Sequence, residues 1–83
     1  MVLSDLEISI IVKNIQFTNN ALSQISFIEI PRCKMNLARN TKLNKQHKID
    51  FYTVHLESLN NEFNQLKMEL DLLNSQLNNN LII

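Results

Sequence analysis

The C-terminal half of the chain carries apolar residues at alternating intervals of three and four positions. This spacing is typical of an α-helix with a narrow apolar stripe, because three and four residues bracket the 3.6 residues of one turn. We call these nine positions the seam: Ile49, Tyr52, Leu56, Leu59, Phe63, Leu66, Leu70, Leu73 and Leu77. A helix cannot cover such a stripe with its own atoms, so the pattern predicts another helix packed on it.

The N-terminal part of the chain also predicts a helix. Ser4 to Glu7 matches the S-x-x-E capping box, in which two side chains satisfy amide groups that a helix start leaves unpaired. Two adjoining apolar stripes follow at helical spacing. One contains Leu6, Ile10, Phe17, Ala21 and Ile28, and the other Ile8, Ile11, Ile15, Leu22 and Ile25. A helix that is apolar over so wide an arc usually packs between neighbours.

A β-hairpin is the alternative for this N-terminal segment. Apolar residues alternate from Leu6 to Ile10, and Thr18-Asn19-Asn20 could turn the chain. The alternation breaks where Ile10, Ile11 and Val12 follow one another. The chain also has no glycine, which tight hairpin turns commonly need. The capping box and the missing glycine favour the helix.

Pro31 is expected to end the first helix, because its ring disfavours a helical Ile30 and it has no amide donor. The segment after it has weak periodicity, and we expect a linker that can be helical from about Lys34. We therefore expect an all-α fold with two helices, at about 4–28 and 45–79, joined by a basic linker. The expected organisation is an N-terminal apolar helix in 1–30, a basic linker in 31–45 and a coiled-coil helix in 46–83.

Four apolar residues of the second helix lie off the seam, where a solvated coiled coil would carry charge: Phe51, Val54, Met68 and Leu72. They indicate a second contact side, to which the apolar C-terminal residues 81–83 would add. The expected partners are other protein chains, in a larger hetero-assembly or a parallel homodimer. The alternative is a hairpin within one chain, in which the first helix folds back onto the seam.

The formal net charge is zero, but its distribution is uneven. No acidic residue lies between Glu29 and Asp50. Six of the eight basic residues fall there, and they are candidate phosphate contacts: Arg32, Lys34, Arg39, Lys42, Lys45 and Lys48. No aromatic residue between Ile30 and Asp50 could stack on a base, so a contact with nucleic acid would be electrostatic. A ribonucleoprotein subunit is therefore an alternative function.

The sequence predicts no catalytic site, metal or cofactor. Cys33 is the single cysteine, so neither a disulfide within the chain nor a thiolate cluster can form. Its neighbours Arg32 and Lys34 would favour a reactive thiolate if it were exposed. His47, Asp50 and His55 do not converge as metal ligands at helical spacing. We expect a protein that is not an enzyme.

No stretch of eighteen apolar residues is present, so we expect no membrane span. The N-terminal residues lack the basic start of a secretory signal, which favours an intracellular protein in the cytoplasm or an organelle. The abundance of Asn, Leu, Ile and Lys indicates an AT-rich genome. The expected function is a structural or adaptor subunit that stabilises a larger assembly through helix packing; a homodimeric coiled-coil regulator is a further alternative.

Overall fold

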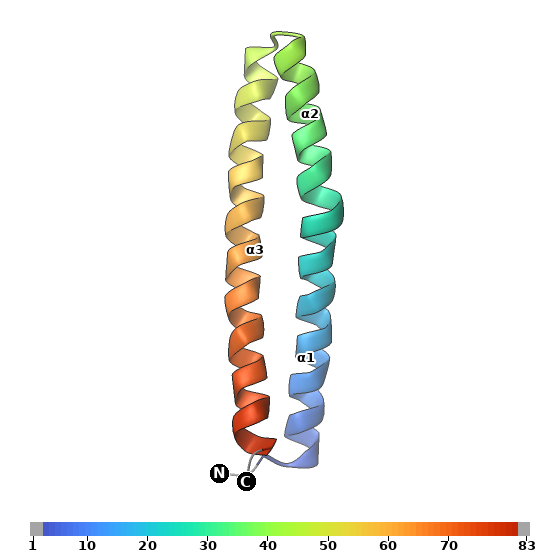
Figure 1. The fold of residues 1–83 in the computed structure, drawn as a ribbon, viewed down its shortest axis with the longest axis vertical. Helices are drawn as coiled ribbons and strands as arrows, with labels where there is room; N and C mark the ends of the chain where they lie inside the picture. Colours follow the sequence, from blue (N-terminus) through green and yellow to red (C-terminus); the bar gives the residue numbers. More distant parts are fainter. Residues whose placement is uncertain (1–2, 82–83) are drawn as a thin grey trace.

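The computed structural model forms a single antiparallel hairpin of two long helices (Figure 1). It describes the backbone of residues 3–81 and the side chains of residues 3–79. The first long helix consists of α1 (Asp5–Gln24), the π-helical turn η1 (Ile25–Glu29) and α2 (Ile30–Lys42), and α3 (Gln46–Leu81) returns beside it. The hairpin measures 59 × 15 × 15 Å. The prediction of an all-α fold with two helices is confirmed, and the described residues contain no strand.

The start of α1 uses the capping box that the sequence predicts. The Ser4 hydroxyl accepts a hydrogen bond from the Glu7 amide at 3.2 Å, and the Ser4 amide donates to Glu7 Oε1 at 3.3 Å. These bonds satisfy amide donors that lack a partner within the helix. The choice of a helix over a β-hairpin for the N-terminal segment is therefore confirmed.

The first long helix does not end at Pro31, contrary to our expectation, because the π-helical turn η1 accommodates the proline ring. The Ile30 amide donates to the carbonyl of Ile25, five residues earlier rather than four. This wider turn leaves room for the proline ring, which would clash with a carbonyl in a regular α-helix. Residues 30–42, most of the expected linker, are therefore helical as α2, and the connection shrinks to residues 43–45.

The sharp reversal between α2 and α3 depends on Asn44, which has φ of 55°. The Lys45 amide donates to the Asn40 carbonyl at 3.1 Å, and the Asn44 amide to the Thr41 carbonyl at 3.2 Å. This pair of bonds is a Schellman motif, in which the residue after the cap adopts the left-handed conformation. Asparagine tolerates that conformation better than most residues, so the chain reverses direction without glycine.

The hydrophobic core is thin and lies along the contact between the two long helices. Its fully buried apolar residues are Ile25, Cys33 and Leu59. Partly buried side chains pack against them, namely Ile30, Tyr52, Leu56, Phe63 and Leu66. A two-helix layer has no third element to enclose this core, so most of its side chains keep one edge in water.

Candidate functional site

The seam of α3 is covered by the chain's own first long helix. All nine seam residues are buried or half-buried, and every other residue of α3 with a described side chain is exposed. α3 contacts α1, η1 and α2 along its length (Figure 1). The structure thus shows the hairpin that the sequence left open as an alternative. A parallel pairing of two seams would require the hairpin to open.

The first long helix presents a matching stripe to the seam. The stripe consists of Ile8, Ile11, Ile15, Thr18, Leu22 and Ile25, and continues after η1 with Ile30, Cys33, Leu37 and Asn40. Its spacing is three or four residues everywhere except across η1, where it is five. The π-turn inserts one residue and so keeps both parts of the stripe facing α3. The sequence predicts the first part as one of two apolar stripes, but the gap of five conceals the second part.

Cys33 is a packing residue of this stripe and not an exposed nucleophile. Only 2% of its surface is accessible, and its Sγ donates to the Tyr52 carbonyl oxygen at 3.3 Å. Burial raises the pKa of the Cys33 thiol, because the low dielectric disfavours the thiolate. The expectation that Arg32 and Lys34 would activate it does not apply, since it depended on exposure.

More large apolar side chains are exposed than are buried. Among the described side chains, three apolar residues are buried and twelve large ones are exposed. The exposed residues are Leu6, Ile10, Val12, Phe17, Phe27, Ile28, Met35, Leu43, Phe51, Val54, Met68 and Leu72. They include all four off-seam residues of the second helix that the sequence singled out. The C-terminal residues 81–83, also expected to contribute, lie outside the described side chains.

The two sides of the hairpin differ in chemistry. Consecutive helical residues lie about 100° apart, so residues that directly precede a stripe or seam residue share one side, and those that directly follow share the other. We call these sides the leading flank and the trailing flank. The leading flank includes the exposed Ile10, Phe17, Phe51 and Leu72. On the trailing flank, Val12 is the one large exposed apolar residue among the described side chains.

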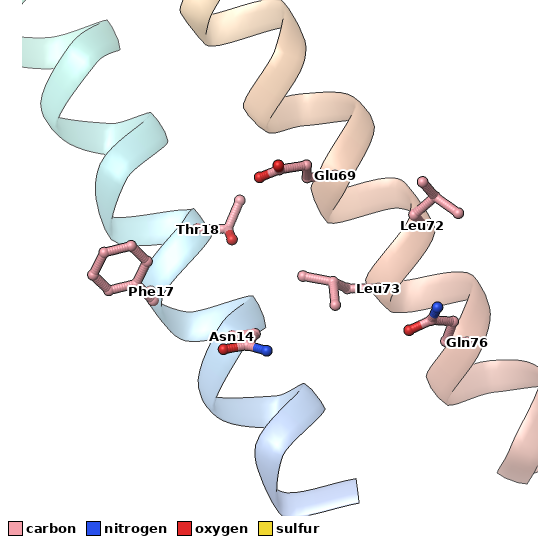
Figure 2. Close-up of a pocket in the computed structure, with 7 residues that line it drawn as sticks. All are labelled: Asn14, Phe17, Thr18, Glu69, Leu72, Leu73 and Gln76. Carbon is pink, nitrogen blue, oxygen red and sulfur yellow. The ribbon is translucent and has the colours of Figure 1, made fainter. Parts of the chain in front are cut away.

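A shallow groove runs along the leading flank between α1 and α3. Its central hollow, of about 440 Å³, has Phe17 on one rim and Leu72 on the other, while Thr18 and Leu73 lie between the helices (Figure 2). A second hollow shares Phe17 with it, and a third shares Gln76. The three hollows therefore form one continuous groove.

The charges of the leading flank differ between its two ends. Arg32, Arg39 and Lys48 precede stripe or seam residues near the turn that closes the hairpin. Glu7 and Glu69 lie on the same flank toward the open end, where both line the groove. One flank thus runs from basic to acidic along the long axis of the hairpin.

The six candidate phosphate contacts surround the closed end of the hairpin. All of them are exposed, and they come from α2, the turn and the first residues of α3. Lys34 directly follows Cys33 and so lies on the trailing flank, away from Arg32 and Arg39. The structure brings the six into one region but spreads them over both flanks.

Two further observations concern the described residues, and a third concerns the whole chain. They contain no group of three or more His, Cys, Asp or Glu side chains that could hold a metal ion. None of their helices is both long and apolar enough to cross a membrane. No protein family, curated protein or solved structure matches this chain.

Proposed function

We propose that this chain is a non-catalytic helical subunit that stabilises a larger protein assembly by packing its exposed apolar surface against other helices. The observation that carries the proposal is the excess of exposed over buried large apolar side chains: among those described, twelve are exposed, whereas Ile25 and Leu59 are buried. Fully burying one such side chain contributes about 1.5–3 kcal/mol. Covering four of them would therefore add about 6–12 kcal/mol, which is comparable with the net stability of a small domain.

The shape of the hairpin supports the same proposal. Its radius of gyration is 18.2 Å, whereas a compact domain of this length has about 12 Å. Its accessible surface is 6508 Å², compared with about 5,100 Å² for a globular protein of this mass. Single domains of this size are often marginally stable and gain stability from a disulfide, a metal or a partner chain. Cys33 cannot form a disulfide within the chain, so a partner chain is the remaining source.

The proposal is tested by comparing two variants of the tagged full-length chain. In the first, Phe51, Val54, Met68 and Leu72 are all changed to Gln. In the control, the exposed trailing-flank residues Thr53, Asn60 and Asn74 are changed to Gln. We expect the wild type and the control to form complexes of defined stoichiometry, and the first variant to lose them while its circular dichroism stays helical. A wild-type chain that remains monomeric and recovers no stoichiometric partner would contradict the proposal.

A contact with nucleic acid is a second candidate function, and the charge of the closed end favours it. Six exposed cations lie between residues 32 and 48 without any acid. Each phosphate contact would steepen the salt dependence of binding. Fluorescence anisotropy with a single-stranded RNA should then show binding that weakens with salt and is lost when Arg32, Lys34, Arg39 and Lys42 become Gln. Binding unaffected by these changes would exclude this function.

A further inference from the structure

We propose that the leading flank binds a second copy of this chain, oriented antiparallel, to form a four-helix bundle of two hairpins. This inference rests on the proposed function, since it names one partner for the exposed apolar surface. The seam is already occupied within each hairpin, so the second copy needs another face. The leading flank has the apolar residues and the continuous groove that such a contact requires, whereas the trailing flank is polar.

The size of this flank suits a stable dimer. A face of 59 by 15 Å has an area of about 900 Å², and standard protein interfaces bury about 800 Å² on each partner. Phe17 and Leu72 are 75% and 63% exposed on the two rims of the groove (Figure 2). Two such grooves facing each other would enclose all four rims and give each hairpin the third and fourth helices that its core lacks.

The charges of the flank decide between a parallel and an antiparallel arrangement. If the two hairpins pointed the same way, Arg32, Arg39 and Lys48 of one copy would face the same cations of the other. With one hairpin turned end for end, these cations face the end that carries Glu7 and Glu69. Opposite charges then meet toward the two ends of the contact, and there the surface is complementary to itself, as a two-fold symmetric interface requires.

The antiparallel arrangement also has a natural register. We place the two-fold axis at Glu62. His55 of one copy then lies opposite Glu69 of the other, and Phe51 lies opposite Leu72, because the midpoint of each pair in the sequence falls within one residue of the axis. On the first long helix, the corresponding pair is Arg39 of one copy and Glu7 of the other, and its midpoint in the sequence is Ser23. That residue lies near the same level, since Ile25 packs in one cluster with Leu59. A single register therefore brings one apolar pair and two polar pairs of complementary chemistry into contact.

The outward faces of the bundle would remain exposed in this arrangement. Eight of the exposed apolar residues lie off both the seam and the leading flank, among them Leu6, Phe27, Met35, Val54 and Met68. They leave a surface through which the dimer can join a larger assembly. The dimer is thus a building unit of the proposed function and not a replacement for it.

The test is a reciprocal exchange at the apolar pair, measured on the full chain by sedimentation equilibrium. Phe51→Lys and Leu72→Glu are made singly and together, and Val54→Lys and Met68→Glu serve as controls of similar exposure. Each contact occurs twice in a two-fold dimer, so each leading-flank variant should weaken dimerisation by at least about tenfold. The double variant should recover most of this loss, because the two introduced charges are opposite and adjacent across the interface. Within one chain the two positions lie 21 residues apart on α3, about 31 Å, and cannot pair.

The outcomes separate this inference from the proposed function. The antiparallel dimer is supported if the wild type has twice the 9.7 kDa chain mass. Each leading-flank single variant must also weaken dimerisation, the double variant must restore it, and the controls must leave it unchanged. A monomeric wild type, or a dimer without rescue in the double variant, overturns it. If the monomeric chain still forms a stoichiometric complex with a different protein through its exposed apolar residues, the proposed function stands and only the second copy is excluded. If it forms none, both fail.

Discussion

The Sγ of Cys33 lies 3.3 Å from the backbone carbonyl oxygen of Tyr52, and this hydrogen bond joins α2 to the first part of α3. The bond is possible because α2 continues the stripe of α1 past Pro31, which places Cys33 against the seam. A thiol is a weak donor, so the contact contributes mainly through the apolar surface that the sulfur buries. The stability and chemistry of this small hairpin follow from contacts of this kind.

Burial of Cys33 predicts a pH dependence of stability. The folded-state pKa of the thiol is raised above its ordinary value of 9.0, so above that pH the unfolded chain loses its proton before the folded chain does. The stabilising contribution of the protonated thiol is therefore complete below about pH 9 and is lost as the pH rises toward the folded-state pKa. We expect the free energy of unfolding of the wild type to fall relative to that of Cys33→Ala between pH 8 and 10. Parallel pH profiles for the two proteins would contradict this.

Leu59 is the most buried seam residue, at 4% exposure, and its truncation should be costly. Leu59→Ala removes buried methyl groups and leaves a cavity, so we expect a loss of about 2–5 kcal/mol in urea denaturation followed by circular dichroism. Leu72→Ala is the matched control on the same helix, because its side chain is exposed, and it should change stability by less than about 0.5 kcal/mol under conditions where the chain is monomeric. Equal effects would mean that the seam is not the contact that holds the hairpin together.

The π-turn predicts an unusual tolerance for the deletion of one residue. In a Pro31→Ala background, deleting the exposed Phe27 gives the stripe a spacing of four across the turn and leaves both parts facing α3. We expect its unfolding free energy to stay within about 1 kcal/mol of the parent, since little apolar burial changes. Deleting Asn19, which is also exposed, is the control. It rotates the N-terminal part of α1 by about 100° and should cost at least about 3 kcal/mol, because Ile8, Ile11 and Ile15 leave the interface.

The reversal at Asn44 predicts a clear ranking of substitutions there. The positive φ of 55° is unfavourable for β-branched residues, so Asn44→Val should lower the unfolding free energy by about 1–2 kcal/mol. Asn44→Gly should remain within about 0.5 kcal/mol of the wild type, because glycine relieves the strain but loses more entropy on folding. Thermal denaturation of the three proteins checks the ranking. A Val variant as stable as the Gly variant would exclude the left-handed conformation in solution.

Glu62 predicts a gain of affinity in the proposed dimer. It lies at the expected two-fold axis, where the carboxylates of the two copies would face each other. Glu62→Gln removes this repulsion and should tighten dimerisation by about two- to fivefold at low salt, with a smaller gain at high salt. Glu57→Gln is the matched control, because Glu57 lies on the trailing flank of the same helix. A similar response of both variants would assign the effect to net charge and not to the interface.

The local part of the fold could be predicted from the sequence because it depends on short-range spacing. The seam from Ile49 to Leu77 needs only an unbroken pattern of three and four residues, and all nine positions are covered in the structure. The Ser4–Glu7 cap depends on residues three apart, and it is present. The continuous helix through Pro31 was not predicted, because the proline was taken as a break, and helical character was expected only as an option from about Lys34. The gap of five between Ile25 and Ile30 hides the stripe. The exposed Phe51, Val54, Met68 and Leu72 follow from their positions off the seam.

By itself, the sequence determined that two helices form and which face of the second one needs covering, because helix periodicity and capping are properties of neighbouring residues. Only the tertiary structure decided what covers that face. The π-turn at Ile25–Glu29 keeps both parts of the stripe facing α3, and the left-handed Asn44 reverses the chain. The first long helix therefore covers the seam of its own chain. The same pairing decides which apolar residues stay in water. Whether Ile10 or Phe17 lies in the core or on the leading flank depends on how the two helices are rotated toward each other, and spacing within one helix does not contain that rotation.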